Sequence, residues 1–185
     1  MSTDDGRVSL EEYAALRATI RERGTLRLAV LLLTFVAWAA LVIAGGLVAE
    51  PLGSLVTLLV LAAGFEVVFA AHVGVERVGR YLQARYESDK GPAWEHVTMA
   101  IGRSLAKGPK SDPLGFWLFV VASLVNLASA GRPLRMGMPS LPVALAVGAH
   151  AVFVWRLVRA RRYAAVQRER DLAFLKDLDE RTKTT

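Results

Sequence analysis

Three polar side chains inside apolar stretches are the residues of this sequence best suited to chemistry. Glu66 lies in the stretch 52–75, Asn126 in 114–130 and His150 in 141–158. Counted along their predicted helices, all three fall in the inner half or the middle of a bilayer. An ionisable group at that depth costs at least ~2.5–3.5 kcal/mol, so it normally faces other protein and has a partner. We therefore expect these three side chains to hydrogen-bond as one intramembrane polar cluster.

A polar cluster of this kind has three interpretations. It could fix how the helices pack, without further chemistry. It could instead bind a proton or an ion in a small transporter or channel, with Glu66 as the intramembrane site, although transport pathways usually need more acids or broken helices. As a third interpretation, His72 and His150, on different helices, could ligate a b-type haem in a redox subunit.

Most catalytic and metal chemistry is not expected. The chain has no cysteine, which excludes disulfides, thiolate metal sites, Fe–S clusters and covalently attached haem. The HExxH, GxSxG and P-loop motifs are absent. The pair Glu95-His96 lacks the three-residue spacing of a di-metal carboxylate site. We expect no enzyme activity and no resident cofactor, with haem b as the alternative.

Four apolar stretches would position these residues, at about 28–49, 52–75, 114–130 and 141–158. At 1.5 Å per residue, stretches of this length suit the ~30 Å hydrocarbon core of a bilayer. Charged residues make up 22% of the chain but are concentrated between these stretches, as in membrane proteins. The prediction is an all-α integral membrane protein, with four transmembrane helices in a bundle and amphipathic cytoplasmic helices at both termini.

Two segments flank the bundle, which extends from 25 to 160 and includes a cytoplasmic loop at 76–113. Residues 1–24 are predicted to form an amphipathic helix, with Ser9 and Glu12 as a capping box and a bend at Gly24. Pro51 is suited to open the second span. The loop 76–113 should continue that helix and add another from Pro92, and residues 161–185 should form a charged cytoplasmic helix.

In this interpretation, the arginines and lysines behind the net charge of +6 set the topology by their position beside the spans. Arginines and lysines gather at the predicted inner ends of the spans, whereas the two outer loops hold only Arg132 and Arg135. The asymmetry predicts that both termini are cytoplasmic. No nucleic-acid-binding signature accompanies the charge, so nucleic acid is not an expected partner. Anionic lipid headgroups could contact the basic residues of the 76–113 loop, namely Arg77, Arg80, Arg85, Arg103 and Lys107.

Small residues at four-residue spacing predict close helix packing. They lie on either side of Glu66 in the second span and recur in the fourth, at Ala62, Ala70, Gly74, Ala144 and Gly148. The sequence thus favours a small, non-catalytic, polytopic membrane subunit. We expect it to contact membrane lipids, and to form a homo-oligomer or to dock on a larger membrane complex through these faces and its cytoplasmic helices.

Overall fold

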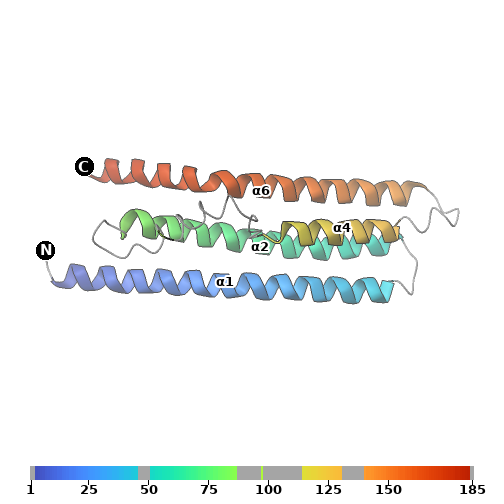
Figure 1. Cartoon of the computed structure of the whole chain (residues 1–185), viewed down its shortest axis with the longest axis horizontal. Coiled ribbons are helices and arrows are strands. Elements are labelled where there is room, and N and C mark those ends of the chain that lie inside the picture. Colours follow the sequence, from blue (N-terminus) through green and yellow to red (C-terminus); the bar gives the residue numbers. More distant parts are fainter. Residues whose placement is uncertain (1–2, 46–50, 87–96, 98–113, 131–139, 184–185) are drawn as a thin grey trace. The chain divides into compact units, whose positions relative to one another are not determined.

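The computed structural model describes residues 3–45, 51–86, 97, 114–130 and 140–183. The secondary structure within these ranges is helical and includes no strand: α1 (Thr3–Gly45), α2 (Pro51–Arg85), α4 (Phe116–Ala130) and α6 (Ser140–Lys183) (Figure 1). By length and composition, α1, α2 and α6 can cross a membrane, and α4 is a shorter apolar helix. The described chain is thus all-helical and has three helices that could span a membrane, which suggests a membrane protein.

Helix α1 differs from the prediction in two respects. It begins at Thr3, so Ser9 lies inside the helix instead of capping its start. It also passes through Gly24 without ending. A single glycine costs a helix interior only ~1 kcal/mol, and no proline lies between residues 3 and 45 to interrupt the hydrogen bonds. The predicted N-terminal helix and first span are therefore one element.

Helices α2 and α6 extend beyond their apolar stretches, as predicted. Helix α2 extends from Pro51 to Arg85. Proline is suited to the start of the helix because the first position needs no backbone N–H. Helix α6 continues through its arginine-rich segment to Lys183. The helix predicted from Pro92, Val97 apart, and most of the predicted outer loop 131–142 lie outside the described residues.

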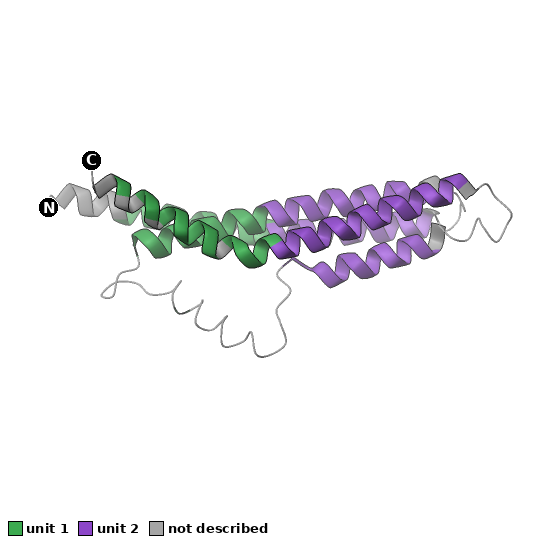
Figure 2. Cartoon of the chain, turned by 90° about the horizontal axis from the view of Figure 1, so that it is seen from above, with its two compact units in different colours: residues 1–26, 71–111, 163–185 green, residues 27–70, 112–162 purple. Residues whose placement is uncertain are grey.

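The chain divides into two compact units, coloured separately in Figure 2. Unit 1 comprises Met1–Leu26, Ala71–Ser111 and Tyr163–Thr185, and unit 2 comprises Arg27–Ala70 and Asp112–Arg162. Most of the predicted membrane-spanning residues belong to unit 2. Unit 1 contains most of the charged flanks of the same helices.

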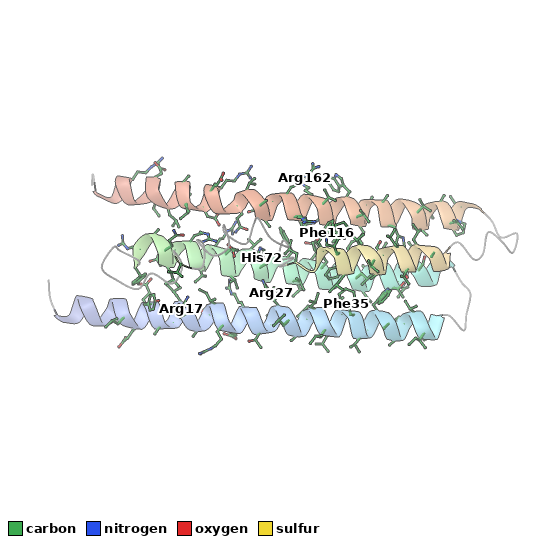
Figure 3. All side chains as sticks on the ribbon, viewed as in Figure 1. Arg17, Arg27, Phe35, His72, Phe116 and Arg162 are labelled. Atoms are coloured by element: carbon green, nitrogen blue, oxygen red, sulfur yellow. The ribbon has the colours of Figure 1, made fainter. Side chains whose placement is uncertain are left out.

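Phenylalanines from four helices pack together in unit 2. The ring of Phe119 in α4 lies 5.1 Å from Phe35 in α1, 5.2 Å from Phe65 in α2 and 6.4 Å from Phe153 in α6. Phe35 is labelled in Figure 3. Phe65 and Phe119 are fully buried, and most of these ring pairs are steeply tilted, as aromatic quadrupoles prefer. This aromatic cluster is a core to which each described helix of unit 2 contributes.

Polar contacts join α2 and α6 in unit 1. Gln167 of α6 is 2% exposed and donates to the carbonyl of Val73 in α2, at 3.2 Å, and to Asp171 one turn further on, at 3.0 Å. Arg77 of α2 donates to the hydroxyl of Tyr163, at 3.4 Å. Leu82, five residues after Arg77 in α2, is fully buried. The charged flanks thus form a packed unit of their own.

Candidate functional site

Asn126 lies at the centre of a buried hydrogen-bond network in unit 2. Its amide nitrogen donates to the backbone carbonyl of Ser54, at 2.7 Å, and to Nε2 of His150, at 3.1 Å. Its Oδ1 accepts a bond of 2.5 Å from the hydroxyl of Thr57. The side chain, 1% exposed, therefore uses both of its protons and its oxygen to join α2, α4 and α6.

The ring of His150 is oriented by two hydrogen bonds. Its Nδ1 lies 2.7 Å from the carbonyl oxygen of Ala146. A carbonyl can only accept, so Nδ1 carries the proton and Nε2 accepts from Asn126. Every donor in this network meets an acceptor, which is the condition for burying polar groups without a large penalty. The arrangement suits a structural contact between helices.

The network has a different membership from the predicted cluster. Asn126 and His150 are together, but Glu66 lies 12 residues after Ser54, or about 18 Å along α2 by helical rise. Ser54 and Thr57, which we did not single out, take its place. Their i, i+3 spacing in an apolar helix was the available signal. It is a weak one, because such hydroxyls usually bond within their own helix, and Thr57 also lies 3.0 Å from the carbonyl of Gly53.

Glu66 has a separate partner in unit 2. Nη2 of Arg156 lies 2.7 Å from its carboxylate, and the guanidinium carbon lies 4.8 Å from the centre of the Phe69 ring and 5.9 Å from that of Phe65. The Glu66 side chain is 49% exposed and that of Arg156 is 31% exposed. The pair neutralises its own charge while the aromatic faces cover one side of the guanidinium.

The predicted small-residue faces differ in what covers them. Ala62 is half-buried, whereas Ala70, Ala144 and Gly148 are exposed. A Cβ atom added at Gly148 would meet nothing within 4 Å in the described structure. The face formed by Ala144 and Gly148 on α6 is therefore not used for packing within the described part of unit 2.

Close helix contact occurs at a different glycine. Gly64 of α2 is buried, and a Cβ added there would overlap the side chain of Thr34 in α1. The Thr34 hydroxyl donates to the carbonyl of Val30, at 2.7 Å. In unit 1, Gly74 has the guanidinium of Arg23 against it. Gly64 lies off the predicted four-residue face, so the sequence pattern did not select it.

A carboxylate held by two tyrosines joins α1 to the end of α2 in unit 1. Glu12 accepts a bond of 3.0 Å from Tyr81 and another from Tyr86, whose ring also lies 5.6 Å from that of Tyr13. These hydrogen bonds, with that of Tyr86 the stronger influence, hold the pKa of Glu12 below its ordinary value of 4.5. Burial, followed by the bond to Glu12, raises the pKa of Tyr86 to about 12. No motif in the sequence predicts this cluster.

The predicted lipid-contacting residues have distinct surroundings. Arg77 bonds to Tyr163, Arg80 is 6% exposed and pairs with Glu76, and Arg85 is exposed. Arg103 and Lys107 lie outside the described residues.

The two histidines of the haem interpretation are buried in different units. His72 is 7% exposed in unit 1 and is labelled in Figure 3, whereas His150 belongs to unit 2. Axial ligation requires a ring-nitrogen lone pair. In His150, Nδ1 is protonated against Ala146 and Nε2 accepts from Asn126. His150 would have to give up the network to bind iron.

Comparison with known proteins identifies no relative: no protein-family model matches the chain, and no curated protein or solved structure is significantly similar to it.

Proposed function

We propose that this protein is a non-catalytic, polytopic membrane subunit that self-assembles, or docks on another membrane protein, through the Ala144–Gly148 face of α6. In this proposal α4 is a fourth membrane-spanning helix in a bundle with α1, α2 and α6. Both termini are cytoplasmic. The polar network around Asn126 supports the proposal because its hydrogen bonds are satisfied within the chain, which suits a packing contact.

The observation that carries the proposal is the open space over Gly148. Helix association in lipid depends on close packing of small residues, because burial of apolar surface gives little advantage there. Ala144 and Gly148 are one turn apart on the same face, both are exposed, and a Cβ at Gly148 would meet nothing within 4 Å. A helix from a second molecule could approach α6 closely at this face.

Disulfide cross-linking in native membranes tests the proposal, since the chain has no cysteine of its own. With Ala144→Cys, mild oxidation is expected to give a covalent dimer. A matched control is Ala44→Cys, an exposed alanine near the end of α1, which should remain monomeric. Adding Gly148→Leu to Ala144→Cys should reduce the dimer several-fold, because the larger side chain separates the helices.

Two outcomes decide between the forms of the proposal. A bifunctional cross-linking reagent can also be used with Ala144→Cys. If it joins this variant to a protein of different mass, the subunit docks on another protein. Equal dimer yields from Ala144→Cys and Ala44→Cys, or none from either together with no cross-linked partner, would contradict it.

A further inference from the structure

A cavity in unit 1 lies between α1 and α2 and has a volume of about 690 Å³. Two charged residues of each helix line it, in each case one turn apart: Arg17 and Arg21 from α1, and Glu76 and Arg80 from α2. Arg17 is labelled in Figure 3. The four-residue spacing directs both members of each pair to one helix face. The cavity is therefore lined by charges from both of its walls.

The charge of the lining is positive. Three arginines and one glutamate give a formal charge of +2. Glu76 is paired with Arg80, and the Arg80 side chain is 8% exposed, so this arginine is held in the wall. Arginine presents several N–H donors in a planar fork that matches phosphate oxygens. The lining is thus suited to an anion with several oxygens.

Of the six remaining lining residues, Tyr13 is aromatic and carries a hydroxyl, and the other five are small or apolar. Ala14 and Ala18 on α1, together with Gly79 on α2, leave the space that forms the cavity, and Ile20 and Val75 add apolar surface. A fully polar anion would gain nothing from this part of the lining. A ligand with a charged group and an adjoining apolar part fits both.

The position of the cavity along its helices corresponds to the membrane surface. Val75 is the last residue of the apolar stretch in α2, and Arg80 lies five residues beyond it, about 7 Å by helical rise. Arg21 lies seven residues before Leu28, where the apolar stretch of α1 begins, which is about 10 Å. The headgroup region occupies roughly the first 5–8 Å outside the hydrocarbon core. By the end of the apolar stretch in α2, the cavity begins at the level of lipid phosphates. By the start of the apolar stretch in α1, Arg21 and Arg17 lie about 10 and 16 Å outside the hydrocarbon core, so their long side chains must extend toward the membrane to meet a phosphate.

We propose that this cavity binds the phosphate group of an anionic phospholipid, with Arg17 and Arg21 as the main phosphate contacts and Arg80 as a fixed third cation. The glycerol backbone would lie against Val75 and Ile20. The proposal requires the protein to lie in a membrane, as the proposed function does, but it is independent of self-assembly.

Native mass spectrometry of the full-length protein in a mild detergent tests this proposal. Phosphatidylglycerol is titrated against wild type and the double variant Arg17→Gln/Arg21→Gln. The double variant loses two arginines that would make charge-assisted hydrogen bonds to the phosphate, so it should bind at least about 10-fold more weakly. Phosphatidylcholine should bind wild type more weakly than phosphatidylglycerol does.

The matched control removes two arginines close to the predicted membrane surface but outside the cavity, as Arg159→Gln/Arg162→Gln. In detergent there is no charged membrane surface, and these two arginines do not line the cavity, so this variant should keep phosphatidylglycerol affinity within about two-fold of wild type. A second cavity variant, Ala18→Phe, fills the space without changing charge and should also weaken binding, while circular dichroism verifies helical content.

Three results would overturn the proposal. Equal losses from the cavity and control variants would indicate general surface charge. Unchanged binding in both Arg17→Gln/Arg21→Gln and Ala18→Phe would remove the cavity from lipid binding. Displacement of phosphatidylglycerol by an equal concentration of inorganic phosphate would identify a soluble phosphate compound as the ligand.

Discussion

Asn126 shows how one amide can join three helices. Its side chain supplies two donors and an acceptor, and each is directed at a different residue, namely Ser54, His150 and Thr57. A hydroxyl at this position could donate only once, and a carboxylate could not donate to the carbonyl of Ser54. The geometry of the site therefore requires an amide.

Replacing Asn126 by leucine removes three interhelical hydrogen bonds. Such bonds in membranes average ~0.6 kcal/mol each and reach ~1.7, so the free energy of unfolding should fall by about 1–3 kcal/mol. Unfolding by sodium dodecyl sulfate in mixed micelles measures the change. In a double-mutant cycle, Asn126→Leu and His150→Leu should be non-additive, since the two residues share a bond.

The control cycle pairs His150→Leu with Leu124→Ala, an exposed position on α4. These two changes should add to within about 0.5 kcal/mol. If Asn126→Leu and His150→Leu are also additive, the bond between the two side chains contributes nothing to stability.

Residue types and depth predicted only part of the candidate site. The sequence placed Asn126 beside His150, and these side chains lie 3.1 Å apart. It also placed Glu66 with them, whereas Arg156 is the residue bonded to Glu66. Counting residues from the predicted cytoplasmic ends of the spans gave Glu66 and Asn126 similar depths. Asn126 instead bonds to Ser54, which lies 12 residues before Glu66 in α2. Hydropathy gives the ends of a span to within a few residues, and each residue of error moves a side chain by 1.5 Å.

At the scale of elements, α1 and α2 approach most closely where Gly64 faces Thr34. The contact depends on the absence of a side chain at Gly64, because a Cβ there would overlap Thr34. Interiors that are packed this tightly accept added atoms only by shifting their neighbours.

Gly64→Ala is therefore expected to destabilise the protein by about 1–3 kcal/mol, the usual cost of overpacking. Thermal unfolding in detergent measures the change, and adding Thr34→Ala should recover part of it. The matched control is Gly53→Ala on the same helix, where the added Cβ would meet nothing within 4 Å. Because alanine has the higher helix propensity, Gly53→Ala should be neutral or slightly stabilising. Equal destabilisation by both substitutions would show that the contact with Thr34 is not the cause.

The helices themselves were the most predictable part of the fold. Apolar stretches and Pro51 located α2 and α6, since hydrophobicity and a missing N–H act locally. The bend predicted at Gly24 and the helix cap predicted at Ser9 do not interrupt α1. The free energies of such local features are small compared with those that keep a long helix continuous. The contact at Gly64 depends on which face of α1 meets α2, and that is decided by the partner helix.

At the scale of the whole molecule, the distribution of charge predicts topology. Charged residues are concentrated in the flanks of the helices, and the predicted outer loops have few of them. By the positive-inside rule, such asymmetry predicts that both termini are cytoplasmic. Composition and hydropathy thus predicted a membrane protein. They did not predict its biological role, because the sequence contains no motif that indicates one.

Single cysteines test this topology without background, because the chain contains none. Glu11→Cys and Glu169→Cys, at exposed positions, should react with a membrane-impermeant maleimide only after the cells are permeabilised. Met136→Cys, in a predicted outer loop, should react in intact cells. Labelling of Glu11→Cys or Glu169→Cys in intact cells would contradict a cytoplasmic location for that end of the chain.

The proton on Nδ1 of His150 has a consequence for spectroscopy. Of three histidines in the chain, His150 alone belongs to unit 2, and its hydrogen bonds select one tautomer. Nitrogen chemical shifts distinguish a ring protonated at Nδ1 from one protonated at Nε2. Labelled His150 is thus a native reporter of this region, and any event that moves Asn126 away would be recorded as a change in the Nε2 chemical shift of one ring.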